Sequence, residues 1–512
     1  MSSVISVPPF LWPWEASSAA CMPGTRPCDN CGSAGEKPVL CVSAPQAYRP
    51  WRLLTCPDCG AGFYEEQRLA DYAAEAMSAI STTYFLQQGA AVCIFADNLA
   101  HIRKGPGARY VEIGCGFGFG LDVAQHAMGW QARGMDPAAL AGLGRQLLGV
   151  DITPAYFDPT MVPDGSCDVI MATEVLEHLP DPLGFLTEVR RGLAPDGILV
   201  LTTPDVAALR PGIAKPVLQA TMTVGLHLIL QSAGSLDLLL RRAGFSHLRV
   251  TSDGWSLTAF ASRRPLDLEE DAAARQARVI HYLATRAASR TEADDLYIGF
   301  AGRGFFAAVS AGEHAAARRI WQDLDERLRE RYGIVIDTIT APVTDAGLAD
   351  EIAMRAGVPF NLAVIMLARA YQRLAEGEPR AAVLPRFYAI ATVCGPLLRW
   401  LAGTQICDMQ TKQILWVAEA EVLLCHAAAG RTATIPALAR LAESPTGAGR
   451  QTIVARALDY LIHAERPFLA ARLAKAEGMA YIRKGAAPSL RTQARAGARE
   501  VFYRMRQGLR GA

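Results

Sequence analysis

The chain carries no excess of charge of either sign. Its 51 lysine and arginine residues almost balance its 50 aspartate and glutamate residues, so the formal net charge at pH 7 is +1. A chain-wide basic field, which would attract the phosphates of a nucleic acid, is therefore absent, and only a local basic patch could take its place. The composition argues against nucleic acid as a partner.

Long apolar runs are also missing. No stretch reaches the roughly 18 uncharged apolar residues that a membrane-spanning helix needs, and the longest candidate, residues 387–398, fits a buried helix better. The first ten residues lack the basic region and apolar core of a secretory signal. We therefore expect a cytoplasmic protein with no membrane partner, whose twelve cysteines are thiols or metal ligands and not disulfides.

A glycine-rich segment at residues 111–120 lacks one glycine of the dinucleotide-binding fingerprint G-x-G-x-x-G. Glycines stand at positions 114, 116 and 118, with Glu112 two residues before the first, but position 119 is Phe. A strand precedes this turn and a helix, residues 121–126, follows it. Glycines there let the backbone approach a ligand, and the helix N-terminus adds free N–H groups. The pattern indicates a nucleotide-like cofactor site; taken alone, it also fits a tight turn without a ligand.

Strand and helix signals alternate after the glycine turn. The expected strands end at or cover residues 134–136, 150–157, 166–173, 197–205, 247–251 and 255–262, and the last expected helix covers residues 235–244. This alternation predicts parallel βαβ units. Asp136, at the end of the second strand, can accept hydrogen bonds from ribose hydroxyls. Phe157 would flank the adenine, and Thr173 completes the expected cofactor contacts.

Taken together, residues 107–264 resemble the class I S-adenosylmethionine (SAM) methyltransferase domain. The resemblance implies an α/β fold, a Rossmann-like doubly wound sheet of seven strands. It also implies that Gly114, Cys115, Gly116 and Gly118 wrap the methionine part of SAM, while Glu112 holds its amino group directly or through water. Two positions depart from the family pattern: residue 196 is Asp where glycine is preferred, and residue 205 is Asp where asparagine is frequent.

Two Cys-x2-Cys pairs stand near the N-terminus. They are Cys28 with Cys31 and Cys56 with Cys59, each followed by a glycine. Four thiolates in a tetrahedron suit Zn2+ and leave no open coordination position, so the predicted zinc is structural. Strand-like residues 38–42 and 51–55 indicate a zinc ribbon at residues 28–62, too small to fold without metal. A redox dithiol is the alternative, but it needs one such pair in a thioredoxin-like context.

A ribbon ahead of a SAM domain is similar to the layout of many bacterial methyltransferases with type 11, 12 or 23 domains, some of which act on sugars or natural products. Residues 1–27 are then an N-terminal tail, and residues 63–106 a helical connector that carries Tyr64, Tyr72 and Tyr84. We expect the connector to cover the mouth of the cofactor site. Amphipathic helices with only a packing role are the alternative.

Glu174, Glu177 and His178 follow the fourth strand, and His227 comes later in the chain. If a helix starts at Glu174, the first three share one face at the carboxyl edge of the sheet. The pattern is similar to that of ubiquinone-pathway O-methyltransferases and small-RNA 2′-O-methyltransferases, some of which bind a metal there. Three interpretations stay open: a divalent-ion site formed by all four residues, His178 or His227 acting as a general base without metal, and a structural network at a helix start.

Residues 265–512 are rich in Ala, Leu and Arg with helical apolar spacing. Helix breaks recur at Gly312, Gly377, Gly430 and Ala464, and their spacing only partly matches the tetratricopeptide period of about 34 residues. We expect an all-α domain of helix hairpins that binds a protein partner, mediates self-association or only buttresses its neighbour. The basic stretch at residues 483–510 is predicted to be a solvated helix face.

The sequence therefore predicts a SAM-dependent methyltransferase whose catalytic residues are His178, His227 and Glu177. Its expected acceptor is a small molecule, similar to a sugar or natural product, methylated on oxygen or carbon. One alternative is a SAM-binding regulatory or scaffold protein that acts through the helical domain, which would not need the Glu/His cluster. A weaker alternative is an RNA methyltransferase.

Overall fold

The computed structural model describes residues 10–12, 22–43, 50–74, 78–211, 213, 215–339, 357–403, 406, 408–442 and 449–477. The chain divides into two compact units. The first contains residues 1–77 and 95–270, and the second contains residues 78–94 and 271–510. The predicted connector is thus shared, because residues 78–94 belong to the helical unit. The basic stretch at 483–510 lies outside the described residues.

A seven-stranded sheet forms the centre of the first unit. Its strands are β5 (Arg109–Ile113), β6 (Gln131–Met135), β7 (Ile152–Thr153), β8 (Cys167–Thr173), β9 (Leu193–Pro204), β11 (His247–Ser252) and β12 (Ser256–Ser262). They lie in the order β11-β12-β9-β8-β5-β6-β7. The pairs among β5 to β9 are parallel, whereas β12 runs antiparallel between β9 and β11. The order reverses at the β5–β8 pair, and open α/β sheets bind ligands at the carboxyl ends of such strands.

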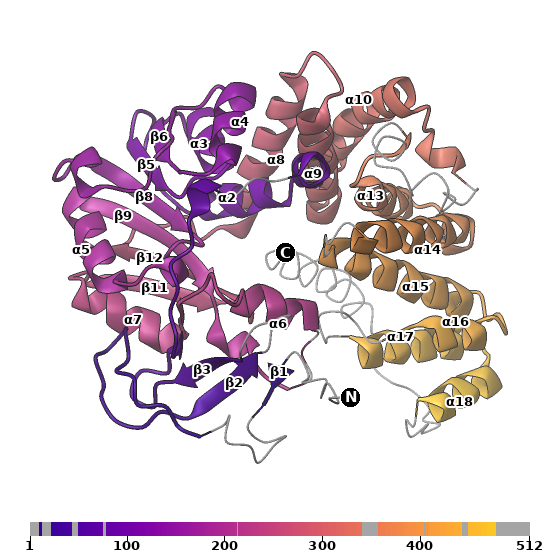
Figure 1. The fold of residues 1–512 in the computed structure, drawn as a ribbon. Helices are drawn as coiled ribbons and strands as arrows, with labels where there is room; N and C mark the ends of the chain where they lie inside the picture. The colour runs from indigo at the N-terminus through magenta and orange to yellow at the C-terminus, as the bar shows by residue number, and fades with distance from the viewer. Residues whose placement is uncertain are drawn as a thin grey trace, which may run out of the picture. The chain divides into compact units, whose positions relative to one another are not determined.

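Helices cover both faces of this sheet (Figure 1). They are α3 (Phe119–His126), α4 (Ala139–Leu148), α5 (Pro182–Gly192) and α7 (Ala233–Arg242). Helix α6 (Lys215–Met222) instead packs in a separate core with Leu53 and Tyr64. The 3-10 turns of this unit are η2 (Tyr72–Ala74), η3 (Pro159–Met161), η4 (Leu176–His178) and η5 (Val206–Ala208). Buried leucines of α5 and α7 pack on the sheet core, while α3 and α4 lie on the opposite face. The predicted doubly wound α/β fold is confirmed.

Two strand lengths differ from expectation. The third strand was expected at residues 150–157, but β7 holds only Ile152–Thr153, because it lies at the sheet edge and pairs only with Gly134 and Met135. The fifth strand, expected at residues 197–205, begins earlier and covers Leu193–Pro204, since it pairs with both β8 and β12. Pairing partners, which sequence periodicity does not reveal, set both lengths.

A second, antiparallel sheet contains the N-terminal strands. Its order is β1 (Phe10–Leu11), β2 (Val39–Ser43), β3 (Trp51–Thr55), β4 (Gly62–Tyr64) and β10 (Ile229–Leu230). The last strand comes from the predicted methyltransferase region and pairs with β4 through Ile229 opposite Phe63. The ribbon is therefore joined by hydrogen bonds to the segment that follows His227.

The described part of the second unit is helical except for its connecting segments. It holds α1 (Ala79–Gln88), α8 (Ala272–Ala288), α9 (Asp295–Ala311), α10 (His314–Tyr332), η6 (Ile336–Thr338), α13 (Leu362–Ala375), α14 (Arg380–Gly403), α15 (Met409–Ala428), α16 (Thr434–Arg440), α17 (Arg450–His463) and α18 (Pro467–Ala476). Helix α2 (Ala90–Ala100) leads from this unit into the first. Helix α1 is packed closely: a Cβ on Gly299 would lie 2.2 Å from the Leu86 carbonyl oxygen. The predicted all-α domain is confirmed and takes in α1.

Helix α14 is, among the described residues, the one helix long and apolar enough to cross a membrane by length and composition. Buried core helices pass the same test, and α14 packs along α15 within the helical unit. Pro385 and Pro396 lie inside it.

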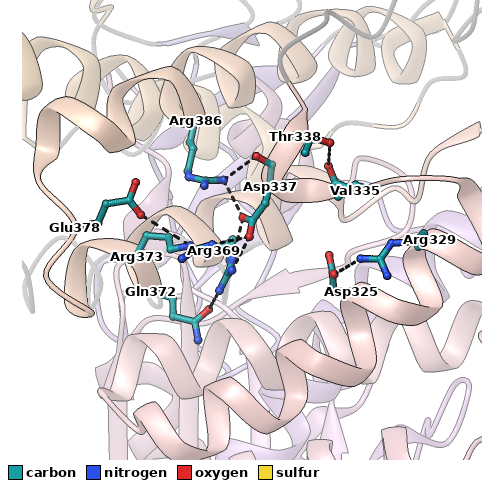
Figure 2. A network of polar contacts seen from close by, with 10 residues as sticks. All are labelled: Asp325, Arg329, Val335, Asp337, Thr338, Arg369, Gln372, Arg373, Glu378 and Arg386. Atoms are coloured by element: carbon teal, nitrogen blue, oxygen red, sulfur yellow. Dashed lines mark hydrogen bonds and ion pairs between the residues drawn. The ribbon is translucent and has the colours of Figure 1, made fainter.

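One carboxylate in the helical unit gathers three arginines (Figure 2). Asp337 of η6 accepts hydrogen bonds from Arg369 at 2.6 Å, Arg373 at 2.8 Å and Arg386 at 2.8 Å, which come from α13 and α14. Partial burial alone would raise the pKa of Asp337, but these hydrogen bonds and charges hold it well below its usual range. The carboxylate thus links three elements and should stay ionised.

We expect Asp337→Asn to lower the free energy of unfolding of the helical unit by about 2 kcal/mol, because Arg369, only 9% exposed, loses its counter-charge. The matched control is Asp325→Asn, which removes one pair with the half-exposed Arg329 (Figure 2) and should cost about 0.5 kcal/mol or less. Urea unfolding followed by helical circular dichroism measures both. Equal effects would show that the Asp337 cluster adds nothing beyond an ordinary surface pair.

Candidate active site

The glycine turn joins β5 to α3 at the carboxyl end of β5. Gly114, Gly116 and Gly118 all have positive φ, at 69°, 50° and 86°, a backbone region that residues with a Cβ rarely adopt. A Cβ on Gly114 would lie 2.5 Å from Val175, and a Cβ on Gly118 would lie 2.9 Å from Ile152. At Gly116, by contrast, no described atom lies within 4 Å of that position. Two glycines therefore serve packing, and the third faces open space.

Asp136 lies beside this turn at the end of β6. One carboxylate oxygen accepts a hydrogen bond from the Gly116 N–H at 2.8 Å, and the other accepts one from the Ala138 N–H at 2.8 Å. These bonds fix the carboxylate next to the glycine turn, and each oxygen keeps a second lone pair for a ligand hydroxyl. Cys115 is buried, and its sulfur is directed toward Gly134. Only the Cys115 backbone is thus placed for the predicted cofactor contact.

Glu112 lies beneath the turn. Its side chain is completely buried under Gly120, and one carboxylate oxygen accepts a hydrogen bond from the Tyr110 hydroxyl at 3.0 Å. The other oxygen, Oε1, has no hydrogen-bond partner among the described residues. Burial is the main cause that raises the pKa of Glu112 to about 8; the Tyr110 hydrogen bond opposes this shift, and the nearby charge of Asp136 adds to it. This placement favours a role in supporting the turn over direct contact with the cofactor.

The raised pKa of Glu112 makes stability depend on pH. Between its ordinary pKa of about 4.5 and its folded pKa of about 8, the folded protein holds a proton that the unfolded chain releases. The resulting stabilisation is complete below pH 4.5 and is lost as the pH rises to about 8. Relative to Glu112→Gln, which cannot titrate, the wild type should lose on the order of 5 kcal/mol across this window. Urea unfolding at a series of pH values measures the difference, and parallel curves would contradict it.

The other two predicted cofactor residues lie at the ends of later strands. Thr173 ends β8 and is half-buried, and its hydroxyl oxygen has no hydrogen-bond partner within the described part of the chain. Phe157 follows β7 and packs edge-to-face on Phe185 of α5, with 5.6 Å between ring centroids. Thr173 thus offers a polar group near the β5–β8 switch point, whereas Phe157 contributes to the core on the α5 face.

Three of the four predicted divalent-ion ligands lie together past β8. Ligand atoms of Glu177, His178 and His227 are all within 4.8 Å of one another, and the two imidazole rings meet edge-to-face at 4.8 Å between centroids. Glu174 is not in this group, as far as the described residues show. The helix expected to start at Glu174 is also absent there: η4 spans only Leu176–His178, and α5 begins at Pro182. Pro182 favours the start of α5 at this position, because proline fits the first turn of a helix, where its missing N–H is not needed.

The two carboxylates take hydrogen bonds from the neighbouring strand β9. The Thr202 hydroxyl donates to Glu174 at 2.9 Å, and the Thr203 hydroxyl donates to Glu177 at 2.9 Å. Burial raises the pKa of both glutamates, and the Glu174 charge raises the pKa of Glu177 further. Oxygen Oε1 of Glu177 has no hydrogen-bond partner within the described residues and lies 3.8 Å from the His178 Nε2. Neither carboxylate caps α5, whose N-cap is Asp181, so a structural role for the two glutamates would run through the threonines of β9.

His227 has a defined tautomer. Its Nδ1 lies 2.9 Å from the Thr221 carbonyl oxygen, which can only accept, so Nδ1 carries the proton and Nε2 is unprotonated. Burial lowers the pKa of His227 to about 4, with a further contribution from His178. Burial also lowers the pKa of His178, whose Nδ1 lies 2.6 Å from the Tyr72 hydroxyl and 3.2 Å from the Leu226 carbonyl oxygen. Both imidazoles are therefore neutral at pH 7.

The four cysteines fit a zinc ion. Cys28 and Cys59 sulfurs are 3.7 Å apart, and Cys31 and Cys56 sulfurs are 3.6 Å apart. A tetrahedron with Zn–S bonds of about 2.3 Å places its sulfurs about 3.8 Å apart. In each pair, the N–H of the following glycine donates to the carbonyl oxygen of the first cysteine, at 2.8 and 2.9 Å. Cys41, outside the predicted set, is buried in β2.

Comparison with known proteins identifies the central fold. Residues 86–250 match the family described as a methyltransferase domain. A probable S-adenosylmethionine-dependent methyltransferase of Mycolicibacterium smegmatis is 32% identical over 153 residues, which cover 29% of this chain and 55% of that protein. The chain carries a class I SAM-dependent methyltransferase domain. The SAM donor predicted from the glycine turn is thereby supported.

Other relatives match the methyltransferase domain over a similar extent. The ubiquinone biosynthesis O-methyltransferase of Cereibacter sphaeroides is 30% identical over 126 residues, covering 23% of this chain and 50% of that enzyme. A SAM-dependent methyltransferase structure from Mesorhizobium loti shares 20% identity and covers 33% of this chain and 95% of its own, with a TM-score of 0.27. The chain spans about half the length of the curated relatives it matches.

Sequence reasoning missed several residues of the methyltransferase site. Thr202 and Thr203, which hold the two glutamates, are polar residues at the end of an otherwise apolar strand, and that interruption was the available signal. Tyr72 was noted only as part of the connector, yet its hydroxyl contacts His178. The Tyr156 hydroxyl fastens the same segment by accepting from the Tyr72 N–H at 2.9 Å. Tyr84, by contrast, belongs to the helical unit.

Proposed function

We propose that this chain transfers the methyl group of SAM to a small-molecule acceptor, and that His227 removes the acceptor's proton. The observation that carries this proposal is the unprotonated Nε2 of a neutral His227 at the carboxyl edge of the sheet. A neutral imidazole can accept a proton, and its low pKa of about 4 suits an acceptor whose own proton is acidic better than an unactivated hydroxyl. A sugar-like or natural-product-like acceptor fits the near-neutral charge of the chain and the name of the ubiquinone-pathway relative.

When bound, SAM supplies an electrophilic methyl group on a sulfonium. The chain's residues must then hold the acceptor in line with that methyl and take its proton. In this proposal the glycine turn and Asp136 hold the donor, and the Glu177–His178–His227 group faces the acceptor. His178 orients the acceptor oxygen or carbon against His227. Since Nδ1 of His227 is bonded to the Thr221 carbonyl, the proton goes to Nε2.

A metal-assisted version is the second candidate, and one observation favours it. The buried Glu177 Oε1 lies near two imidazoles, and its hydrogen-bonding capacity is unused among the described residues. One carboxylate and two imidazoles are common ligands of divalent transition metals. In this version Glu177, His178 and His227 would hold the ion, which would supply Lewis-acid polarisation of an acceptor hydroxyl.

The proposal is tested by incubating the protein with SAM that carries a deuterated methyl group, together with panels of hydroxylated small molecules, total RNA and no acceptor. Mass spectrometry should find the label on a small molecule. Label on RNA would contradict the small-molecule acceptor, and the absence of any label would favour a SAM-binding scaffold. The metal version is tested on the acceptor found: mild chelation that keeps four-cysteine zinc should abolish turnover, and added Mg2+, Mn2+ or Zn2+ should restore it. Undiminished turnover after chelation would rule out the metal version and leave proton removal by His227 as the explanation.

A further inference from the structure

The loop that carries His227 joins α6 to β10 and has little regular structure of its own. Thr223 and Gly225 have positive φ, and the His227 N–H donates to the Thr223 carbonyl oxygen at 3.1 Å. Toward the sheet the loop bonds to the segment after β8, through the Leu228 N–H to the Glu177 carbonyl oxygen at 2.7 Å and through the Leu226 carbonyl oxygen to the His178 Nδ1 at 3.2 Å. A catalytic group on such a loop needs further support to hold its position.

Tyr64 ends β4, so the ribbon's sheet extends beyond the expected boundary at residue 62 and takes in this first tyrosine of the expected connector. Tyr64 bonds to both ends of the His227 loop. Its hydroxyl donates to the Met222 carbonyl oxygen at 3.1 Å, where the loop begins. Its backbone N–H donates to the Leu228 carbonyl oxygen at 3.1 Å, directly after His227. The side chain is 1% exposed, and its ring packs edge-on against Trp51 of β3. A single residue of the ribbon thus fixes the distance between the two ends of the loop.

Asn30 connects the next segment of the chain to the cysteine cluster. It lies between Cys28 and Cys31 and is completely buried. Its side-chain amide donates to the Ser235 carbonyl oxygen at 3.0 Å and accepts from the Gln231 amide at 3.1 Å. Gln231 immediately follows β10, so the turn between Cys28 and Cys31 also anchors the strand leading out of the His227 loop.

We propose that the ribbon positions the acceptor site's base, with Tyr64 and Asn30 as positioning residues for His227. This inference rests on the proposed function of His227. A metal at the four cysteines would then hold the turn around Asn30 in place. Because Asn30 bonds to Gln231, and β10 pairs with the strand that ends at Tyr64, this turn would also order residues 222–228. Loss of metal or of the Tyr64 hydroxyl should loosen this loop without disturbing the glycine turn.

The test measures hydrogen–deuterium exchange of the full-length protein over residues 222–230, together with turnover. Tyr64→Phe keeps the ring and the backbone bond but removes the bond to Met222. We expect exchange in this segment to rise, and kcat to fall, each by about tenfold, which corresponds to one lost hydrogen bond. Affinity for S-adenosylhomocysteine and the metal content should not change. Asn30→Ala, and removal of metal by a strong chelator, should both loosen the same segment.

Tyr297→Phe is the matched control. Tyr297 is equally buried, but its hydroxyl donates to Asp323 within the helical unit, so exchange at residues 222–230 should stay at the wild-type level. The inference is overturned if Tyr64→Phe exchanges there like the wild type, or if the loop loosens and kcat does not change. Exchange and S-adenosylhomocysteine binding need no acceptor, so they test the ribbon's role even if the proposed reaction is wrong.

Discussion

Gly116→Ala is expected to weaken S-adenosylhomocysteine binding by about 100-fold while the protein stays folded. The Cβ of this alanine would enter the space beside the turn, where no described atom lies within 4 Å. It would also sit next to the N–H that bonds to Asp136. The positive φ of 50° adds only a modest strain, on the order of 1 kcal/mol, to the cost of folding.

Gly165→Ala provides the control for this variant. Gly165 has a φ of 64°, and no described atom lies within 4 Å of its Cβ position, so the backbone strain is similar. It precedes β8 and therefore lies at the amino edge of the sheet, opposite the proposed site. Calorimetric titration and thermal unfolding should show equal stability losses but weakened binding only in Gly116→Ala. Equal affinities of the two variants would mean that the ligand does not occupy the space beside Gly116.

His227→Ala and His178→Ala should each lower turnover by at least about 100-fold and leave the affinity for S-adenosylhomocysteine unchanged. His227→Ala removes the unprotonated Nε2, and His178→Ala removes the imidazole that packs against it. The exposed His247 at the start of β11 offers the control, since His247→Ala should retain full turnover. Initial rates on the acceptor found by label transfer measure this effect.

Turnover near the wild-type level in both variants would remove the base and the metal interpretations together. A loss in His227→Ala alone would assign proton removal to that residue and leave His178 with an orienting role. A loss of S-adenosylhomocysteine binding in either variant would instead place these histidines at the donor, against the arrangement proposed here.

The sequence predicts the parts of the fold that depend on local pattern. The apolar strands, the glycine turn and the two cysteine pairs lie where expected, because each is specified by neighbouring residues. Two-residue strands such as β10 cannot be predicted in this way. The pairing of β10 with β4 joins residues more than 160 positions apart, as in Ile229 with Phe63, and no local signal specifies such a contact. The union of the ribbon with the His227 segment could therefore be seen only in three dimensions.

In the candidate site, too, some residues could be predicted from the sequence, and others depend on contacts between distant parts of the chain. Asp136, Thr173 and Glu177 were placed by a topological rule, that parallel strands bring their carboxyl ends to one edge. The separation of Glu174 from the Glu177–His178–His227 group was not foreseeable, because Glu174 has a backbone φ of 54° after β8. The contact of Tyr72 with His178 spans 106 positions and likewise needs the folded chain.

Calorimetric titration of the full-length protein with S-adenosylhomocysteine tests the central claim most directly. The account predicts one binding site per chain with a dissociation constant of about 1 μM, or roughly −8 kcal/mol, abolished or strongly weakened in Gly116→Ala. A well-folded protein that shows no binding would contradict the assignment of the glycine turn as a SAM site, and with it the proposed reaction.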